Sequence, residues 1–130
     1  MKTGAQTPRP TDAELEVLAV LWSIGPATVR QVHEVILQRR PAQYSTILKF
    51  MQIMADKGLV LRNEEQRAHI YQAAHPREWT QQQLAGHLLE RAFSGSAKAL
   101  LIGALSAKKT TKAELAELRK LVDEYGKGAK

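Results

Sequence analysis

The chain has 130 residues, a net charge of +6 and no cysteine. Its apolar content of 44% and charged content of 25% are typical of one compact domain, or of a small domain with an appendage. The lack of cysteine excludes disulfides, thiolate zinc sites and cysteine nucleophiles, and the basic balance favours an anionic partner such as nucleic acid.

Neither a secretion signal nor a membrane insertion segment is expected. The N-terminal sequence "MKTGAQTPRP", residues 1–10, has no apolar stretch after its cation and is predicted to be a flexible arm. The longest apolar run, residues 99–105, is too short to span a bilayer. We therefore expect a cytoplasmic protein.

Three segments whose apolar residues recur at helical spacing each begin with a helix start signal. Each is a capping box, in which Ser or Thr is followed three residues later by Glu or Gln: Thr11 with Glu14, Thr28 with Gln31, and Thr111 with Glu114. The first helix should stop at the "GP" of Gly25 and Pro26, and the second should end before Pro41. Their apolar positions are Leu15, Leu18, Leu21 and Trp22, and then Val29, Val32, Ile36 and Leu37.

The third helix lies in "YSTILKFMQIMADKGLV", residues 44–60, and its two sides differ. The apolar stripe suited to a core consists of Ile47, Phe50, Met51 and Met54. The opposite side is mostly short and neutral, with one cation: Ser45, Lys49, Gln52 and Asp56. Gly58 is the natural end of this helix.

After Gly58 the apolar period changes from 3.6 to 2. "LVLRNEEQRAHIYQA" has an apolar run at residues 59–61, a polar tip at residues 63–66, and an alternation through Ala68, Ile70 and Gln72. This pattern predicts a β-hairpin. Three helices followed by a hairpin is the order of a winged helix-turn-helix, which we assign to residues 11–76.

Residues 77–126 are predicted to be helical, and residues 127–130 to be a flexible tail. The apolar stripes of this region cannot close a core on their own, so a homodimer is expected. The predicted interface residues are Leu84, Leu88, Phe93, Leu101, Leu105, Leu115, Leu118, Leu121 and Val122. The expected fold is mostly α with a small β-hairpin wing: a winged helix-turn-helix plus a C-terminal helical dimerisation region.

The polar side of the third helix has the chemistry of a DNA-reading surface. In a helix-turn-helix, the second helix of the pair enters the major groove, where short side chains can hydrogen-bond to base edges. We assign base contacts to Ser45, Thr46, Lys49 and Gln52. Contacts to the DNA backbone are expected from Thr28, Arg30, Arg39, Arg40, Tyr44, Arg67 and His69.

Four motifs in this order resemble the penicillinase-repressor family of bacterial regulators, of the BlaI/MecI/CopY type. They are "PTDAELEVLAVLW", "ATVRQVHEVI", "YSTILKFMQIMADKGLV" and "RAHIYQ". The resemblance implies a homodimeric repressor on a palindromic operator in double-stranded DNA. It also implies that a membrane-embedded sensor metalloprotease, or an agent that it activates, triggers cleavage in the C-terminal dimerisation region. Ser45, Thr46 and Lys49 match positions used for DNA contact in the family, whereas Leu48 stands where some relatives carry Arg.

The chain departs from the family at two places. The scissile Asn-Phe dipeptide of the β-lactam-responsive members aligns with Gly103 and Ala104, so this chain lacks that dipeptide. The copper-responsive branch binds metal through C-terminal cysteines, which are absent here, and the four histidines form no HExxH motif. No metal, cofactor or catalytic residue is predicted.

Two other functions are compatible with the same sequence. The winged helix could bind a protein instead of DNA, or the chain could be a ligand-responsive DNA-binding regulator that uses no proteolysis and has a pocket between the first two helices after Pro76. The charge distribution leaves a separate question open: either DNA affinity is modest and dimer-dependent, or the second half of the chain also contacts the DNA backbone. Residues 1–78 hold ten Lys and Arg against eight Asp and Glu, whereas residues 79–130 hold nine against five. The excess positive charge is therefore not concentrated in residues 1–78, which contain the predicted DNA-binding domain.

Overall fold

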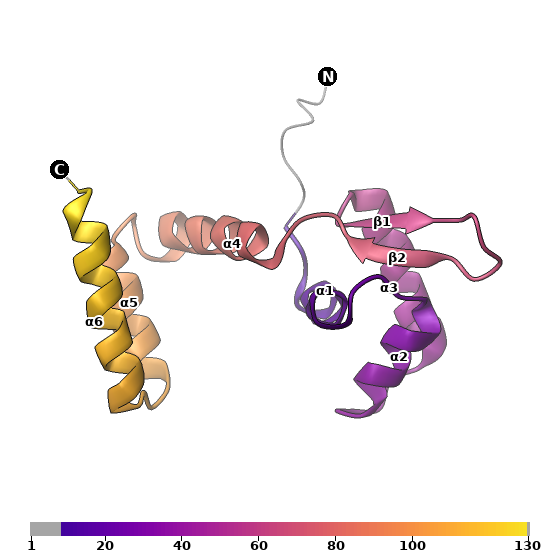
Figure 1. Cartoon of the computed structure of the whole chain (residues 1–130), viewed down its shortest axis with the longest axis horizontal. Coiled ribbons are helices and arrows are strands. Elements are labelled where there is room, and N and C mark those ends of the chain that lie inside the picture. The colour runs from indigo at the N-terminus through magenta and orange to yellow at the C-terminus, as the bar shows by residue number, and fades with distance from the viewer. Residues whose placement is uncertain (1–8, 130) are drawn as a thin grey trace, which may run out of the picture. The chain divides into compact units, whose positions relative to one another are not determined.

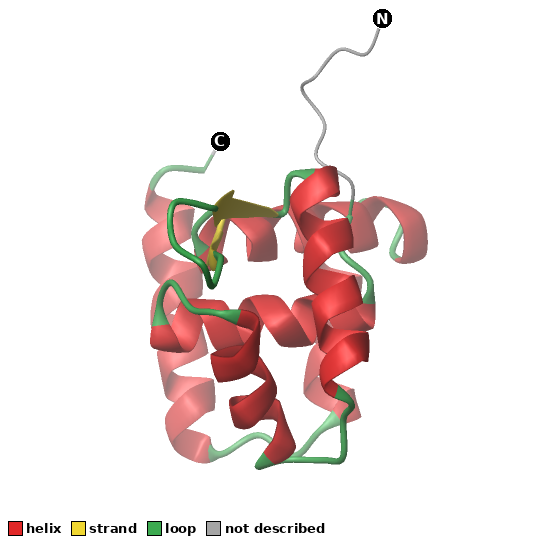
Figure 2. Ribbon diagram, turned by 90° about the vertical axis from the view of Figure 1, so that its right-hand side faces the viewer, coloured by secondary structure: helices red, strands yellow, loops and turns green. Residues whose placement is uncertain are grey.

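The computed structural model describes residues 9–129, which form six helices and a two-stranded antiparallel hairpin (Figures 1 and 2). The elements are α1 (Asp12–Ile24), α2 (Val29–Leu37), α3 (Tyr44–Lys57), β1 (Val60–Asn63), β2 (Ile70–Ala73), α4 (Arg77–Ala92), α5 (Ala97–Ala107) and α6 (Lys112–Lys127). The predicted mostly helical fold with a hairpin wing is confirmed. Residues 1–8 of the expected arm and residue 130 of the expected tail lie outside the described residues.

The chain divides into two compact units after Leu84. The first unit contains α1 to β2 and the beginning of α4, and the second contains the rest of α4 with α5 and α6. The predicted boundary after residue 76 coincides with the start of α4. The division into units falls inside this helix instead.

The predicted helix caps are formed. The first two are complete capping boxes, in which side chain and backbone bond reciprocally: Thr11 with Glu14 and Thr28 with Gln31. The third is one-sided, because the Thr111 hydroxyl accepts the Glu114 amide at 3.0 Å without the return bond of a capping box. Gly58 ends α3 with φ 83°, a left-handed conformation that glycine adopts without the Cβ penalty of other residues.

One hydrophobic core holds α1, α2, α3 and the hairpin together. Its fully buried side chains include Val17, Leu18, Leu21, Val32, Ile36, Ile47, Met51, Met54, Val60 and Tyr71. The stripe predicted on α3 is therefore confirmed, with Phe50 partly buried at its margin. Leu37 was predicted to share the apolar stripe of α2. This is wrong, because α2 ends there and the side chain is 46% exposed.

The hairpin forms, but the alternation predicted for its second strand has the wrong phase. The inward side chain is Tyr71, whereas Ala68 and Gln72 are exposed. The reason is a backbone bridge to the loop before α2: the Tyr71 amide donates to Ala27 O at 2.8 Å, and the Ala27 amide donates to Tyr71 O at 2.9 Å. This bridge turns Tyr71 into the core, where an aromatic ring of its size contributes a large buried area.

A half-buried ion pair joins the first helix to the end of the third. Lys57 Nζ lies 2.8 and 2.9 Å from the two carboxylate oxygens of Glu14, which is itself buried. Burial acts to raise the pKa of Glu14, but hydrogen bonds from Lys57 and Thr11 and the charge of Lys57 outweigh it. The pKa therefore lies below its ordinary value of 4.5. Glu14 thus caps α1 and ties it to α3 at the same time.

The start of α4 is fixed to the first unit. Trp22 Nε1 donates to the carbonyl of His75 at 2.9 Å, and the His75 ring stacks on Trp79 with centroids 3.9 Å apart. Thr80 is buried one turn into the helix. These contacts explain why the first turns of α4 belong to the same unit as the wing.

The second unit has no such core. Neither α5 nor α6 contains a buried residue. At Gly103, an added Cβ would lie 3.4 Å from the Phe93 ring. No described helix is long and apolar enough to cross a membrane.

The ion pair predicts a specific effect of Glu14→Gln. Glutamine can keep the capping box but cannot neutralise Lys57, so the free energy of unfolding at pH 7 should fall by about 1–2 kcal/mol. Because the folded-state pKa of Glu14 is lowered, its contribution is complete above its ordinary value of 4.5 and is lost as the pH falls through the folded value. Urea unfolding of wild type and variant across this pH range, at one protein concentration, measures both effects.

Glu64→Gln is the matched control. Glu64 pairs with Arg62 at 2.7 Å on the exposed wing, where an ion pair is worth about 0–1 kcal/mol. Equal losses for the two variants would contradict a special role for the Glu14 pair.

Candidate nucleic-acid interface

The side of α3 that faces away from the core is open to solvent. Ser45, Thr46, Lys49 and Gln52 are all exposed, while Ile47, Met51 and Met54 are buried on the opposite side. All four candidate base-contact residues therefore lie on the accessible side of one helix. The N-cap residue Gln43 makes no side-chain hydrogen bond to the first turn of α3.

The turn between α2 and α3 is held by His33. Its Nε2–H donates to the carbonyl of Ala42 at 2.7 Å, and its ring meets the edge of Tyr44 with centroids 5.7 Å apart. Tyr44 remains 45% exposed, so its hydroxyl is available to a partner. The sequence offered no signal for this role of His33, because the contact depends on how the two helices cross.

The two arginines before α3 have different surroundings. Arg40 binds both carboxylate oxygens of Glu16 and also donates to the carbonyl of Pro41 at 3.0 Å. The hydrogen bond from Arg40 lowers the pKa of Glu16. Arg39 is exposed, and the described residues give it no ion pair. Arg40 therefore braces α1 against the α2–α3 turn, and Arg39 has the charge open to a phosphate.

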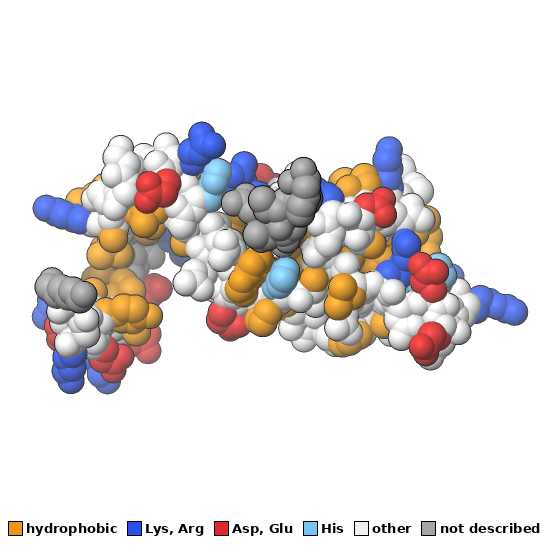
Figure 3. Space-filling view, turned by 90° about the horizontal axis from the view of Figure 1, so that it is seen from above, with side chains coloured by type: hydrophobic (Ala, Val, Ile, Leu, Met, Phe, Trp, Pro, Cys, Tyr) orange, Lys and Arg blue, Asp and Glu red, His pale blue; other side chains and the backbone are white. Residues whose placement is uncertain are grey.

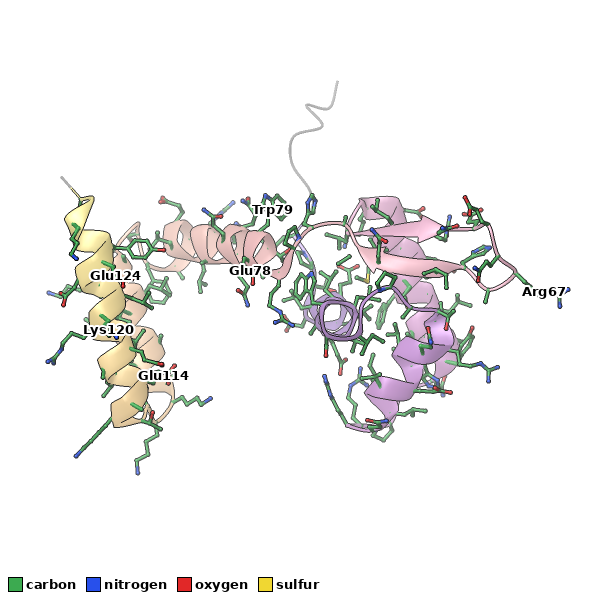
Figure 4. The ribbon with its side chains drawn as sticks, viewed as in Figure 1. Arg67, Glu78, Trp79, Glu114, Lys120 and Glu124 are labelled. Carbon is green, nitrogen blue, oxygen red and sulfur yellow. The ribbon has the colours of Figure 1, made fainter. Side chains whose placement is uncertain are left out.

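The wing carries the other predicted backbone contacts. Arg67 and His69 are exposed in the loop between β1 and β2, and Figure 4 shows Arg67 at the far end of the hairpin, pointing away from it. At the start of α2, Arg30 is exposed as well, whereas the Thr28 hydroxyl already accepts the Gln31 amide. Thr28 thus has a capping role whether or not it meets DNA.

Two sets of cations in the first unit differ in their ion pairing. Three pair with glutamates of the same unit: Arg40, Lys57 and Arg62. Another group, Arg30, Arg39, Lys49 and Arg67, has no ion pair within residues 9–129. This second group lies on α2, the α2–α3 turn, α3 and the wing. The elements expected to meet DNA therefore carry exposed cations that have no ion pair with the described residues, although the net charge of this half is small.

An open cavity of about 390 Å³ lies on the first unit, between the end of α1 and the segment that joins β2 to α4. It is lined by Leu21, Trp22, Gly25, Pro26 and residues 72–76. This is not the pocket that the ligand-responsive alternative predicts after Pro76. Within residues 9–129, the His, Asp and Glu side chains form no group that could hold a metal ion.

The second unit exposes apolar side chains. Of the predicted interface residues, Leu88, Leu101, Leu115, Leu121 and Val122 are 41–60% exposed, and Leu84, Phe93, Leu105 and Leu118 are half-buried. Ile102 and Tyr125, which the predicted set omitted, are 55% and 79% exposed. Figure 3 shows hydrophobic side chains open to solvent beside charged ones on the C-terminal helices. The spacing of Tyr125 on α6 could have added it to the set.

The positions aligned with the scissile dipeptide lie inside a helix. Gly103 and Ala104 are in the middle of α5, and the missing Cβ of Gly103 leaves room for the Phe93 ring. A protease would have to unwind α5 to reach this bond. Since α5 has no buried residue, local opening should require little free energy.

Comparison with known proteins relates this architecture to a family. A sequence model of the penicillinase repressor matches residues 10–124. The transcriptional regulator BlaI of Mycobacterium tuberculosis is 39% identical over 100 residues, which are 75% of this chain and 72% of the relative.

Two solved structures are similar in fold. The DNA binding domain of the repressor BlaI matches with a TM-score of 0.50 at 24% identity, over 55% of this chain and 88% of that chain. YusO from Bacillus subtilis matches with a TM-score of 0.51 at 21% identity, over 92% of this chain and 76% of that chain. From the extent of the family match and the identity to BlaI, the chain belongs to the penicillinase repressor family, whose members are transcriptional repressors and not enzymes.

Proposed function

We propose that the protein is a sequence-specific repressor that binds a palindromic operator as a homodimer, with α3 of each protomer in the major groove. The observation that carries this proposal is the exposed polar side of α3, formed by Ser45, Thr46, Lys49 and Gln52. These side chains can donate to and accept from base edges. The buried side of the same helix keeps them facing outward.

The exposed cations that have no ion pair support the assignment of backbone contacts. Arg30 and Arg39 would meet phosphates on either side of the groove that α3 enters, and Arg67 would reach the flanking backbone from the wing. The pairing of Arg40 with Glu16 makes it a support for this surface in our proposal. Electrostatic attraction of this kind makes binding strongly salt-dependent.

Homodimerisation is supported by the composition of the second unit's surface. Leucines, Ile102, Val122 and Tyr125 are exposed on helices that bury nothing by themselves. Apolar patches of this kind on a folded chain mark interaction surfaces. A second copy would supply the missing partner surface. A two-fold dimer would also hold two reading helices about one helical turn of DNA apart, or a multiple of it.

Relief of repression by proteolysis in the C-terminal region is part of the proposal, with a membrane sensor metalloprotease as the triggering partner. The weakly held α5 helix is compatible with cleavage near Gly103 and Ala104 after local opening. Cutting there would separate α6 from the DNA-binding unit and weaken the dimer.

Selection of genomic DNA fragments by the purified protein tests the function. Fragments are captured at two salt concentrations and sequenced. We expect enrichment of a short inverted repeat whose binding weakens steeply as salt rises, because counterions are released on binding. Absence of enrichment over random fragments would contradict the proposal and direct attention to a protein partner for α3 and the wing.

Lys49→Ala should weaken binding to the enriched duplex by about 1–3 kcal/mol, since Lys49 lies at the centre of the polar side and is assigned to a base. Fluorescence anisotropy with a labelled duplex measures the affinity. Lys120→Ala removes the same charge from an exposed position on α6, so it controls for net charge. An affinity equal to wild type in Lys49→Ala would rule out the assigned contact.

Val122→Asp should dissociate the dimer and reduce operator affinity about 100-fold or more, because the second half-site is then no longer bound together with the first. Val122 is 60% exposed in the protomer, so the aspartate disturbs little of the protomer's own packing. Sedimentation velocity reports the oligomeric state. Lys120→Asp, on the opposite side of α6, places the same carboxylate outside the stripe and should stay dimeric; a dimeric Val122→Asp would refute the interface.

A further inference from the structure

One exposed residue of α3 does not fit a purely polar reading surface. Ile53 follows Gln52 in the chain and is 38% exposed. It is not part of the buried core, to which α3 contributes Ile47, Met51 and Met54. Among the exposed residues of α3 beyond its first residue, Ile53 is the only aliphatic one.

Its place along the helix relates it to the assigned base contacts. Ile53 is four residues after Lys49 and seven after Thr46, so the three side chains lie near one another on one side of α3. With a rise of 1.5 Å per residue, Ile53 stands about 6 Å beyond Lys49 along the axis.

The chemistry of an isoleucine in the major groove is restricted. It can neither donate nor accept a hydrogen bond, so against adenine, guanine or cytosine it would leave polar edge atoms without a partner. Thymine alone presents a methyl group there, which an aliphatic side chain can cover. Contact between the two methyl-bearing groups removes apolar surface of both from water.

We propose that Ile53 is a specificity-determining residue that selects thymine through its 5-methyl group, at a base near the one read by Lys49. The inference rests on the proposed insertion of α3 into the major groove. The apolar contact of Ile53 would select thymine, in addition to the base selection by the hydrogen bonds assigned to Lys49 and Gln52. It also explains why an apolar side chain stands exposed between Gln52 and the core residue Met54.

The test uses the inverted repeat recovered by the genomic selection. Each thymine of a half-site is replaced in turn by deoxyuridine, which removes the methyl group and keeps every hydrogen-bonding atom. We expect wild type to lose affinity about threefold to fourfold at one position, the effect of about one buried methylene-sized group. In Ile53→Ala, the same replacement should have no effect, whereas Ile53→Val, which keeps the branched methyl groups, should retain most of it.

Two control variants test whether the effect of deoxyuridine replacement comes from Ile53 or from another apolar side chain. Thr46→Ser removes the other methyl group near this side of α3 and keeps the hydroxyl, so loss of the deoxyuridine effect in this variant instead of Ile53→Ala would overturn the inference. Leu61→Ala removes an exposed leucine from β1 and should leave the effect unchanged. An unchanged thermal midpoint for Ile53→Ala excludes unfolding as its cause.

The remaining outcomes are distinguishable. Salt-sensitive binding of an inverted repeat without sensitivity to any thymine methyl overturns the role of Ile53 and leaves the repressor function standing. If no duplex is bound at all, the proposed function fails, and the role of Ile53 fails with it.

Discussion

The burial of Ile47, Met51 and Met54 against α1 and α2 fixes the rotation of α3 about its own axis. An α-helix presents residues three and four apart on the same side, so this burial decides which other residues face solvent. Ser45, Lys49 and Gln52 point outward because the methionines point inward. The base contacts proposed for this helix therefore depend on core packing that itself touches no base.

The ion pairs of the first unit extend this constraint to the neighbouring helices. Glu14 holds Lys57 at the end of α3, and Glu16 holds Arg40 at the turn before it. Both carboxylates come from α1, so this helix fixes α3 near each of its ends. The same pairs neutralise the charges of two cations, Lys57 and Arg40. Arg30, Arg39, Lys49 and Arg67 take no part in the ion pairs that hold the helices together.

The helices α5 and α6 of the second unit are not held by a buried core within the single chain. These helices have well-formed starts, at Ser96 and Thr111, but they bury no residue in the single chain. Most of the stability of a helix in a protein comes from packing of its apolar side, so these helices require a further surface. Dimerisation supplies that surface in the proposed function. It would couple the stability of the C-terminal helices to the pairing of the two reading heads.

The sequence alone determined the first three helices with their ends, the order of elements and the two sides of α3, because these depend on local capping, glycine and apolar periodicity. It also identified the polar residues now found exposed on α3. Only the tertiary structure decided the phase of β2, since the Tyr71 bridge to Ala27 joins segments far apart in the chain. The same is true of the pairs that Arg40 and Lys57 make, and of Leu37 being exposed. Contacts between distant residues depend on how helices cross, which no local pattern encodes.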